Sequence, residues 1–299
     1  MEEWPPRADL RYGSGLAGGR AGAFRGEDRV EIRGAVAIVT GASSGIGAVT
    51  AEELARRGAT VVAVARRPDK LSQVVERCRT YTPDSRAHPA DVADRAACES
   101  VIQRAAEEFG RVDIVVNNAG ISLRRHAAES SVEEIERVMA VNFYGAVYVT
   151  MAALPGMLER RHGSIINVTS VAGYIPNPHE SAYGASKAAL SLWSHGLAVD
   201  LHGRGVHVGV LSPGPIDTEI WEKDEEEAAY DGPLYPPSVV AIGIARLIAS
   251  EKVHMTIPRH YGLVGAFYPL LGGPMRRGLI AHQHRAEQRG RAQKRPPKS

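Results

Sequence analysis

Short apolar runs alternate with amphipathic segments along most of this chain. The runs lie at Ala35–Thr40, Thr60–Val64, Val112–Asn117, Ser164–Val168 and Val206–Leu211. Each is almost continuously apolar, which is typical of strands in a parallel sheet that helices cover on both faces. The pattern therefore predicts a doubly wound α/β fold with a single domain.

The composition divides the chain into three parts. Residues 1–33 hold six glycines between Gly13 and Gly26 with scattered arginines, which predicts a flexible extension. The alternative is that translation starts at Val30. Residues 34–257 carry the alternating pattern and are expected to form the domain, and residues 258–299 are an apolar segment followed by a basic tail.

Composition and charge exclude several classes of protein. The 299 residues are 44% apolar and 23% charged, as in globular proteins, and a net charge of +2 gives no general reason to bind nucleic acid. Cys78 and Cys98 are too few for a disulfide framework and are expected to be reduced thiols. No signal pattern and no uncharged apolar run of about 18 residues is found. We therefore expect a cytoplasmic protein without a metal site.

The first apolar run leads into Thr40-Gly41-Ala42-Ser43-Ser44-Gly45-Ile46-Gly47. Glycines between a strand and a helix let the backbone turn tightly and approach a pyrophosphate, which the positive end of the helix attracts. Such a cluster can also be an ordinary turn. The strand before it and the helix after it favour a dinucleotide site.

The end of the second run bears on which dinucleotide binds. An acidic residue there would accept hydrogen bonds from the adenosine ribose, whereas this strand ends in Ala65-Arg66-Arg67. An arginine can hold a 2′-phosphate in its fork of donors, and we expect Arg66 to make this contact. This favours NADP(H) with NAD(H) possible, although both arginines can also be solvated charges at a helix entry.

Three further residues suggest acid–base chemistry. Tyr183 and Lys187 are four apart and share one face of a predicted helix, and Ser170 follows the strand Ser164–Val168. A lysine ammonium near a phenol lowers the tyrosine pKa, which suits proton transfer at working pH. Taken alone, such a pair can also be an ordinary helix face.

Together these motifs resemble the short-chain dehydrogenase/reductase family, over roughly Gly34 to Ile257. The matching motifs, in order, are the glycine turn, Asp91-Val92, Asn117-Asn118-Ala119-Gly120, Asn142, Ser170, Tyr183 with Lys187, and Pro213-Gly214. The resemblance implies a Rossmann fold and an enzyme that uses a nicotinamide cofactor to oxidise CH–OH groups or to reduce the corresponding carbonyls. Ser44 departs from the pattern, because many NADP-preferring relatives have a basic residue there.

The resemblance also implies a role for each matching residue. Tyr183 would be the general acid/base, Lys187 would lower its pKa and hold the nicotinamide ribose, Ser170 would bind the substrate oxygen, and Asn142 would hold a water that links Lys187 to solvent. Cofactor contacts are expected from Gly41, Ser43, Ser44, Gly45, Ile46, Gly47, Arg66, Arg67, Asp91, Val92, Asn118, Ala119, Gly120, Tyr183, Lys187, Pro213, Gly214, Ile216 and Thr218.

The substrate is expected among Ser122–Ala128, Val171–Glu180 and a lid at Pro215–Pro237 that carries eight acidic residues against Lys223 alone. These acids would disfavour an anionic substrate if they face the crevice, or they belong to a solvated mobile loop. The expected reaction interconverts an alcohol with a ketone or aldehyde. The alternatives are an acyl-thioester ketoreductase, a dinucleotide sensor without turnover and a membrane-surface scaffold.

Two surfaces suggest partners. The helices expected around Val132–Leu158 and Ser181–Leu201 carry broad apolar stripes, and the family commonly pairs them across a two-fold axis, so we expect a homodimer or homotetramer. After Ile257, apolar residues recur at helical spacing before a tail with eight Lys/Arg against Glu287. This segment is expected to cover the pocket or an interface, or to attach the protein to anionic lipid.

Overall fold

A computed structural model describes residues 29–221, 232–265, 267–268, 272–274, 276–278 and 280–281. Its centre is a seven-stranded sheet in the order β3-β2-β1-β4-β5-β6-β7. The strands are β1 (Val36–Thr40), β2 (Thr60–Ala65), β3 (Arg86–Pro89), β4 (Ile114–Asn117), β5 (Gly163–Val168), β6 (Val206–Pro213) and β7 (His254–Ile257). All six neighbouring pairs are parallel, so the predicted doubly wound fold is confirmed.

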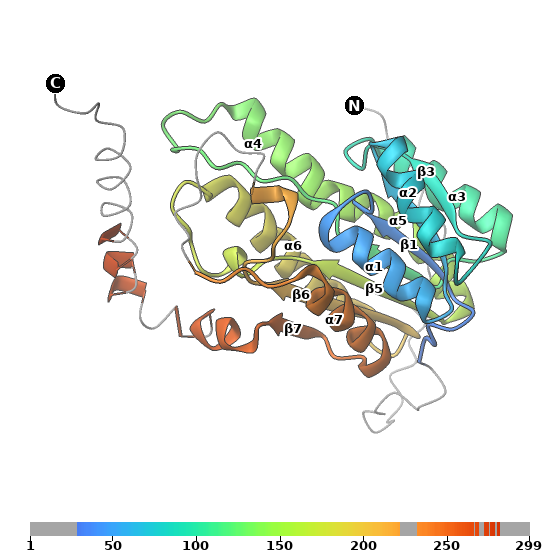
Figure 1. Ribbon diagram of the computed structural model, residues 1–299. Helices are drawn as coiled ribbons and strands as arrows, with labels where there is room; N and C mark the ends of the chain where they lie inside the picture. Colours follow the sequence, from blue (N-terminus) through green and yellow to red (C-terminus); the bar gives the residue numbers. More distant parts are fainter. Residues whose placement is uncertain are drawn as a thin grey trace, which may run out of the picture.

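Two layers of helices cover the sheet (Figure 1). The helices are α1 (Gly45–Arg56), α2 (Pro68–Arg79), α3 (Arg95–Phe109), α4 (Val132–Met139), α5 (Gly145–Arg160), α6 (Ser181–Asp200) and α7 (Pro237–Ser250). One buried cluster unites α1, α2 and α7 with one face of the sheet, and a second unites α3, α5 and the end of α6 with the other.

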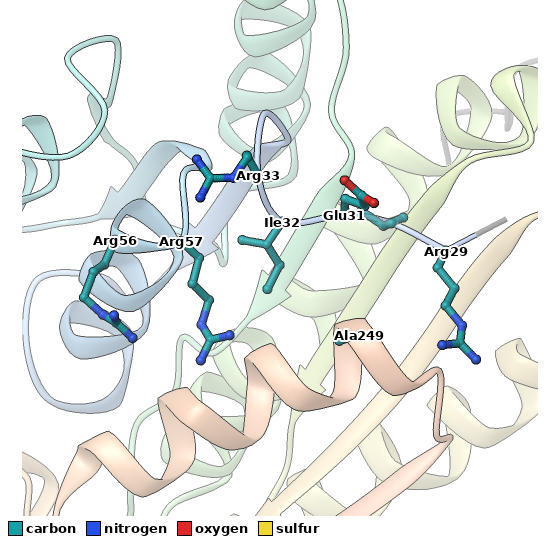
Figure 2. Close-up of a pocket in the computed structure, with 8 residues that line it drawn as sticks. Arg29, Glu31, Ile32, Arg33, Arg56, Arg57 and Ala249 are labelled. Atoms are coloured by element: carbon teal, nitrogen blue, oxygen red, sulfur yellow. The ribbon is translucent and has the colours of Figure 1, made fainter. Parts of the chain in front are cut away.

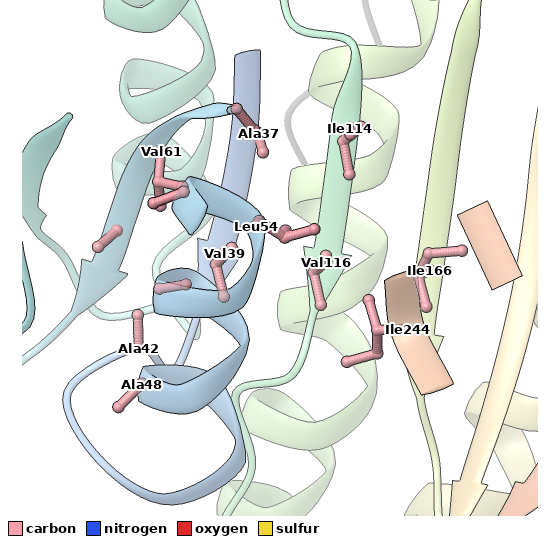
Figure 3. Close-up of a cluster of buried hydrophobic side chains, with 14 of the residues drawn as sticks. Ala37, Val39, Ala42, Ala48, Leu54, Val61, Ile114, Val116, Ile166 and Ile244 are labelled. Carbon is pink, nitrogen blue, oxygen red and sulfur yellow. The ribbon is translucent and has the colours of Figure 1, made fainter. Parts of the chain in front are cut away.

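The two clusters explain why the strands are apolar without alternation. In β1, Ala37 and Val39 belong to the first cluster, whereas Ile38 between them belongs to the second. Successive side chains of a strand point to opposite faces, so both faces need apolar residues. Figure 3 shows Val39 in the first cluster with Leu54 of α1 and Ile244 of α7.

The two edge strands, β3 and β7, were not predicted from the sequence. The sequence of β3 is Arg-Ala-His-Pro and that of β7 is His-Met-Thr-Ile, and no residue of either strand is fully buried. An edge strand is covered less completely than a central one, so it lacks the continuous apolar run by which the other five strands were found.

The longest helical stretch, Val132–Arg160, joins α4 and α5 through the π-helical turn η2 (Ala140–Tyr144). It is long and apolar enough to cross a membrane by length and composition alone, but half of its most apolar part is buried within the fold. Here α5 packs against α3 and β4. Such packing is that of a helix covering a sheet.

The two cysteines are free and buried, Cys78 in α2 and Cys98 in α3. Burial raises the pKa of each thiol to about 12, so both stay protonated at neutral pH. The expectation of reduced thiols agrees with this arrangement.

Candidate active site

A crevice of about 900 Å³ opens at the carboxyl ends of the central strands. The order of the sheet reverses between β1 and β4, and ligands of doubly wound folds bind at such a reversal. Nineteen of the predicted site residues line the crevice: Gly41, Ser43, Ser44, Gly45, Ile46, Arg66, Arg67, Asp91, Val92, Asn118, Ala119, Gly120, Ser170, Tyr183, Lys187, Pro213, Gly214, Ile216 and Thr218. Gly47 and Asn142 lie behind its wall.

The glycine turn is formed by close backbone contacts. Gly41 has φ of +66°, and a Cβ there would lie 2.7 Å from the Cα of Ala119. A Cβ on Gly47 would overlap the carbonyl oxygen of Gly41. The turn therefore needs glycine at both positions, and Gly47 acts from behind the crevice by allowing α1 to approach the turn.

The amino end of α1 is available to an anion. Its N-cap residue, Ser44, makes no side-chain capping bond, and no acidic residue lies in the first turn. The first N–H groups of a helix, together with its dipole, favour a phosphate at such a place. The turn and helix end therefore fit the pyrophosphate of a nicotinamide dinucleotide.

Arg67, rather than Arg66, is held against the glycine turn. Its guanidinium donates to Ser43 Oγ at 3.1 Å and to Ser44 Oγ at 2.7 Å. Arg66 is more exposed and lies 3.9 Å from Asp91, which Arg137 binds at 2.7 Å. No sequence motif marks Lys70, whose Nζ shares the carboxylate of Glu219 with Arg67.

A buried polar chain attaches α6 to the sheet. Asn117 of β4 donates to Asn167 of β5 at 2.8 Å, and Asn167 donates to Ser194 of α6 at 2.8 Å. Buried polar groups need such partners, so the chain fixes how α6 lies on the strands. Since α6 carries Tyr183 and Lys187, this chain also places the candidate catalytic residues.

Ser170, Tyr183 and Lys187 meet where β5 and α6 face the crevice. The hydroxyl of Ser170 accepts from the N–H of Ala172 at 3.1 Å and acts on the Tyr183 phenol, whose pKa it lowers. The ammonium of Lys187 donates to the carbonyl of Val168 at 3.0 Å and lies 5.9 Å from the centre of the Tyr183 ring. The predicted trio is thus brought together.

Burial has the largest effect on the pKa values of Tyr183 and Lys187. It raises the pKa of Tyr183 to about 12, against the opposing effect of the Ser170 hydroxyl. Burial also lowers the pKa of Lys187 to about 8. Desolvation of the phenolate is the larger effect and opposes the lowering of the Tyr183 pKa that was expected from Lys187, whose role stays a prediction.

Asn142 sits behind Lys187 in the turn η2 and is buried. Its amide donates to the carbonyl of Ile121 at 2.9 Å and to Ser186 Oγ at 2.9 Å, and its Oδ1 accepts from the N–H of Ile121 at 2.8 Å. These bonds join the loop after β4 to α6. The water-holding role of Asn142 stays a prediction.

Arg124 is a crevice residue that the sequence analysis did not distinguish from its neighbour Arg125. Only 4% exposed, it lies 3.4 Å from the carboxylate of Glu180, donates to the carbonyl of Ile220 at 2.9 Å and stacks 5.1 Å from the Trp221 ring. It therefore ties the loop after β4 to the lid and to the start of α6. No spacing in the sequence marks this role, because each partner comes from a distant segment.

All three segments expected around the substrate reach the crevice, through Arg124, residues 177–180 and residues 215–221. Of the eight acidic lid residues, only Asp217 and Glu219 are among the described residues, and only Glu219 of these two lines the crevice. Its carboxylate faces Arg67 and Lys70.

The segment after Ile257 begins against the crevice. Tyr261 lines it, and a Cβ on Gly265 would overlap the ring of Tyr174. The side chains of Leu263, Val264 and Phe267 are exposed. The segment thus reaches the pocket through Tyr261, and its role in covering the pocket or an interface stays a prediction. The tail beyond Ala281 lies outside the described residues, and its attachment to membranes also stays a prediction.

A second hollow lies between the segment that leads into β1 and the carboxyl ends of α1 and α7, away from the crevice (Figure 2). Arg29, Arg33, Arg56 and Arg57 surround it. Glu53 accepts from Arg56 at 2.9 Å and from Arg57 at 2.7 Å, so two of these arginines already share a carboxylate. The hollow contains no acid–base pair comparable to Tyr183 and Lys187.

Comparisons with known proteins agree with the geometry. Residues 35–229 match the profile of the family described as short chain dehydrogenase. The 3-oxoacyl-[acyl-carrier-protein] reductase FabG of Thermotoga maritima is 35% identical over 234 residues, which are 76% of this chain and 95% of that protein.

Solved structures are similar over most of the chain. A short chain dehydrogenase/reductase from Burkholderia phymatum in complex with NAD matches with a TM-score of 0.75 and 26% identity, over 81% of this chain and 95% of that one. An alcohol dehydrogenase from Thermococcus sibiricus complexed with 5-hydroxy-NADP matches with a TM-score of 0.67 and 26% identity, over 74% and 95%. The fold, the crevice and the matched residues lead to one conclusion: the chain belongs to the short-chain dehydrogenase/reductase family and is an oxidoreductase.

Proposed function

We propose that the protein is an NADP(H)-dependent oxidoreductase that interconverts a ketone or aldehyde with the corresponding alcohol. The observation that carries the proposal is the grouping of Ser170, Tyr183 and Lys187 in the same crevice as the glycine turn. A proton donor and a dinucleotide site side by side are what carbonyl reduction requires.

The residues of the chain transfer the proton and stabilise the charge that develops on the substrate oxygen, and the bound cofactor would supply or accept the hydride. With a pKa of about 12, Tyr183 is a neutral phenol at working pH and can donate its proton to a carbonyl oxygen. Ser170 presents a second hydroxyl to the same oxygen, where negative charge develops. The two hydroxyls therefore fix where the substrate oxygen lies.

Lys187 supports this transfer by its charge. With a pKa of about 8, it is mostly cationic at neutral pH, and the bond to Val168 holds its ammonium one helical turn from Tyr183. A phenolate left after proton donation gains more from a nearby cation in a buried site than in water. Lys187 is thus matched to the charge that Tyr183 acquires.

The preference for NADP(H) is supported by charge at the end of β2. The strand ends in Ala65 where an acid would select NAD(H), and Arg66, Arg67 and Lys70 follow. A 2′-phosphate carries about two negative charges and suits such a group of cations. NAD(H) is the second candidate, since Ser44 adds no positive charge on the glycine turn.

Reduction of an acyl thioester is the alternative reaction. It is favoured by the similarity to FabG of Thermotoga maritima, which extends over 95% of that protein. Comparing the rates on a β-ketoacyl thioester and on simple ketones, with NADPH and with NADH, separates the two reactions.

The proposal includes a homo-oligomer in the cytoplasm. Large apolar side chains are exposed along α4, η2, α5 and α6, namely Val132, Ile135, Tyr144, Met151, Leu192 and Val199. Leu192 and Val199 are seven residues apart, which puts them on one face of α6 at 77% and 75% exposure. A second copy of the chain would remove this apolar surface from water.

Replacing Tyr183 with phenylalanine tests the reaction itself. Tyr183→Phe keeps the ring but removes the proton donor, so turnover should fall about 10²–10⁴-fold while the cofactor still binds. Following the absorbance of the reduced nicotinamide measures the rate, and quenching of protein fluorescence measures cofactor binding. A variant with nearly the native rate would exclude Tyr183 as the acid.

The buried charge of Lys187 predicts a pH-dependent stability. Its pKa in the folded protein, about 8, is below the ordinary value of 10.5, so between these values the unfolded chain binds more protons and stability rises with pH. At neutral pH the charge is therefore destabilising. Lys187→Met should raise the free energy of unfolding by about 1–3 kcal/mol there.

That gain should shrink as the pH rises from about 8 to about 10, while activity is lost at every pH. Urea unfolding of both proteins at several pH values measures it. A gain that is the same at all pH values would show that packing, not charge, is responsible.

Single alanine substitutions test which arginine holds the 2′-phosphate. Arg67→Ala should raise the KM for NADPH about tenfold or more and change that for NADH much less, because a charge-assisted bond to phosphate contributes about 1.5–3 kcal/mol. Arg66→Ala should have the smaller effect, since Arg66 lies farther from the turn. If the effects of the two substitutions are reversed, Arg66 is the phosphate ligand.

Light scattering at micromolar concentration should give a mass of two or more chains. Leu192→Glu places a charge on the exposed face of α6 and should shift the protein to a monomer. Tyr81→Glu is the matched control, because Tyr81 is also exposed, at 54%, but lies just beyond α2. A monomeric native protein would refute the proposed assembly.

A further inference from the structure

Glu219, in the described part of the lid, contacts the cations beside the glycine turn. Glu219 begins the short turn η4 (Glu219–Trp221). One of its carboxylate oxygens accepts from Arg67 at 3.0 Å and the other from Lys70 at 2.7 Å. One carboxylate thus holds two cations that come from a segment about 150 residues earlier in the chain.

The position of Arg67 relates this contact to the cofactor. While one guanidinium nitrogen binds Glu219, another binds Ser44 Oγ at 2.7 Å. Arg67 and Glu219 both line the crevice, next to the end of β2, where the adenosine ribose of a bound dinucleotide lies. The carboxylate therefore satisfies the donors that a ribose 2′-phosphate would use.

The charge of Glu219 is permanent at working pH. The hydrogen bonds from Lys70 and Arg67 lower the pKa of its carboxyl to about 2. Both cations are about half exposed, so a ligand can approach them without prior unfolding of the site.

We propose that Glu219 is a specificity-determining residue, whose carboxylate competes with the 2′-phosphate of NADP(H) for Arg67 and Lys70. The proposal rests on the proposed dinucleotide binding and adds to it a residue of the lid. Glu219 would therefore weaken the binding of NADP(H), because the 2′-phosphate must displace a carboxylate that is already bonded to Arg67 and Lys70. The non-phosphorylated cofactor meets no such competition.

The turn η4 does not depend on the Glu219 carboxylate for its place. Arg124 binds the carbonyl of Ile220 at 2.9 Å, and the indole of Trp221 donates to the carbonyl of Ile216 at 2.6 Å. Glu219→Gln therefore removes the charge and leaves these anchors. The substitution is close in size and tests competition rather than folding.

The experiment is calorimetric titration of the full chain with two nucleotides that differ only in the 2′-phosphate. These are 2′,5′-ADP, which carries the phosphate, and 5′-AMP, which lacks it. Glu219→Gln should tighten the binding of 2′,5′-ADP about fivefold or more, which corresponds to about 1 kcal/mol, and that of 5′-AMP less than about twofold. Asp69→Asn is the matched control, because it removes the same charge from the exposed first turn of α2, next to Lys70.

Three outcomes overturn the proposal: an unchanged affinity for 2′,5′-ADP in Glu219→Gln, a weaker one, or an equal gain in Asp69→Asn. A weaker affinity would mean that Glu219 orders the two cations for the phosphate. If the native protein binds both nucleotides equally, the NADP(H) preference fails, but a selective gain in Glu219→Gln still supports competition. If the native protein prefers 2′,5′-ADP and Glu219→Gln does not alter the preference, only the role of Glu219 fails.

Discussion

The hydroxyl of Thr40 joins the two strands between which the sheet reverses its order. It accepts hydrogen bonds from the backbone N–H groups of Asn118 at 3.0 Å and Ala119 at 3.1 Å, while the side chain of Asn118 donates to the Thr40 carbonyl at 3.0 Å. The ends of β1 and β4 are thereby held so close that Gly41 has no room for a side chain against Ala119. The glycine turn and the loop after β4 take their places from this junction, and the crevice lies between them.

Desolvation sets the chemical character of the site that this frame supports. Burial favours the neutral form of both side chains: it raises the pKa of Tyr183 and lowers the pKa of Lys187. A buried ammonium beside a neutral phenol destabilises the folded protein, because its charge has no opposite charge next to it. The same pair suits proton transfer, since the phenolate formed when Tyr183 gives up its proton is stabilised by the nearby ammonium of Lys187. The hydrogen bonds from Asn117 to Asn167 and from Asn167 to Ser194 hold α6 against the sheet at this point.

Much of the fold could be predicted from the sequence because five strands are buried on both faces and therefore consist mainly of apolar residues. The site residues were predictable where they belong to a local motif, as with Tyr183 and Lys187 one helical turn apart. Arg67 could not be distinguished from Arg66, because the direction of each side chain depends on where α2 begins. Arg124 and Glu219 could not be found at all, since their partners are distant in the chain and only the folded backbone brings them together.

The position of β1 in the sheet has a consequence for the order in which the chain folds. Strands β1, β2 and β3 lie within residues 36–89, but the other neighbour of β1 is β4, which begins at Ile114. As the chain leaves the ribosome, the first three strands can therefore pair while one edge of β1 still exposes unpaired N–H and C=O groups. Such an edge is open to pairing with another nascent chain. The stretch through α3 must emerge before β4 can close it, so the residues that later bind the dinucleotide lie at the part of the sheet most open to misassembly during synthesis.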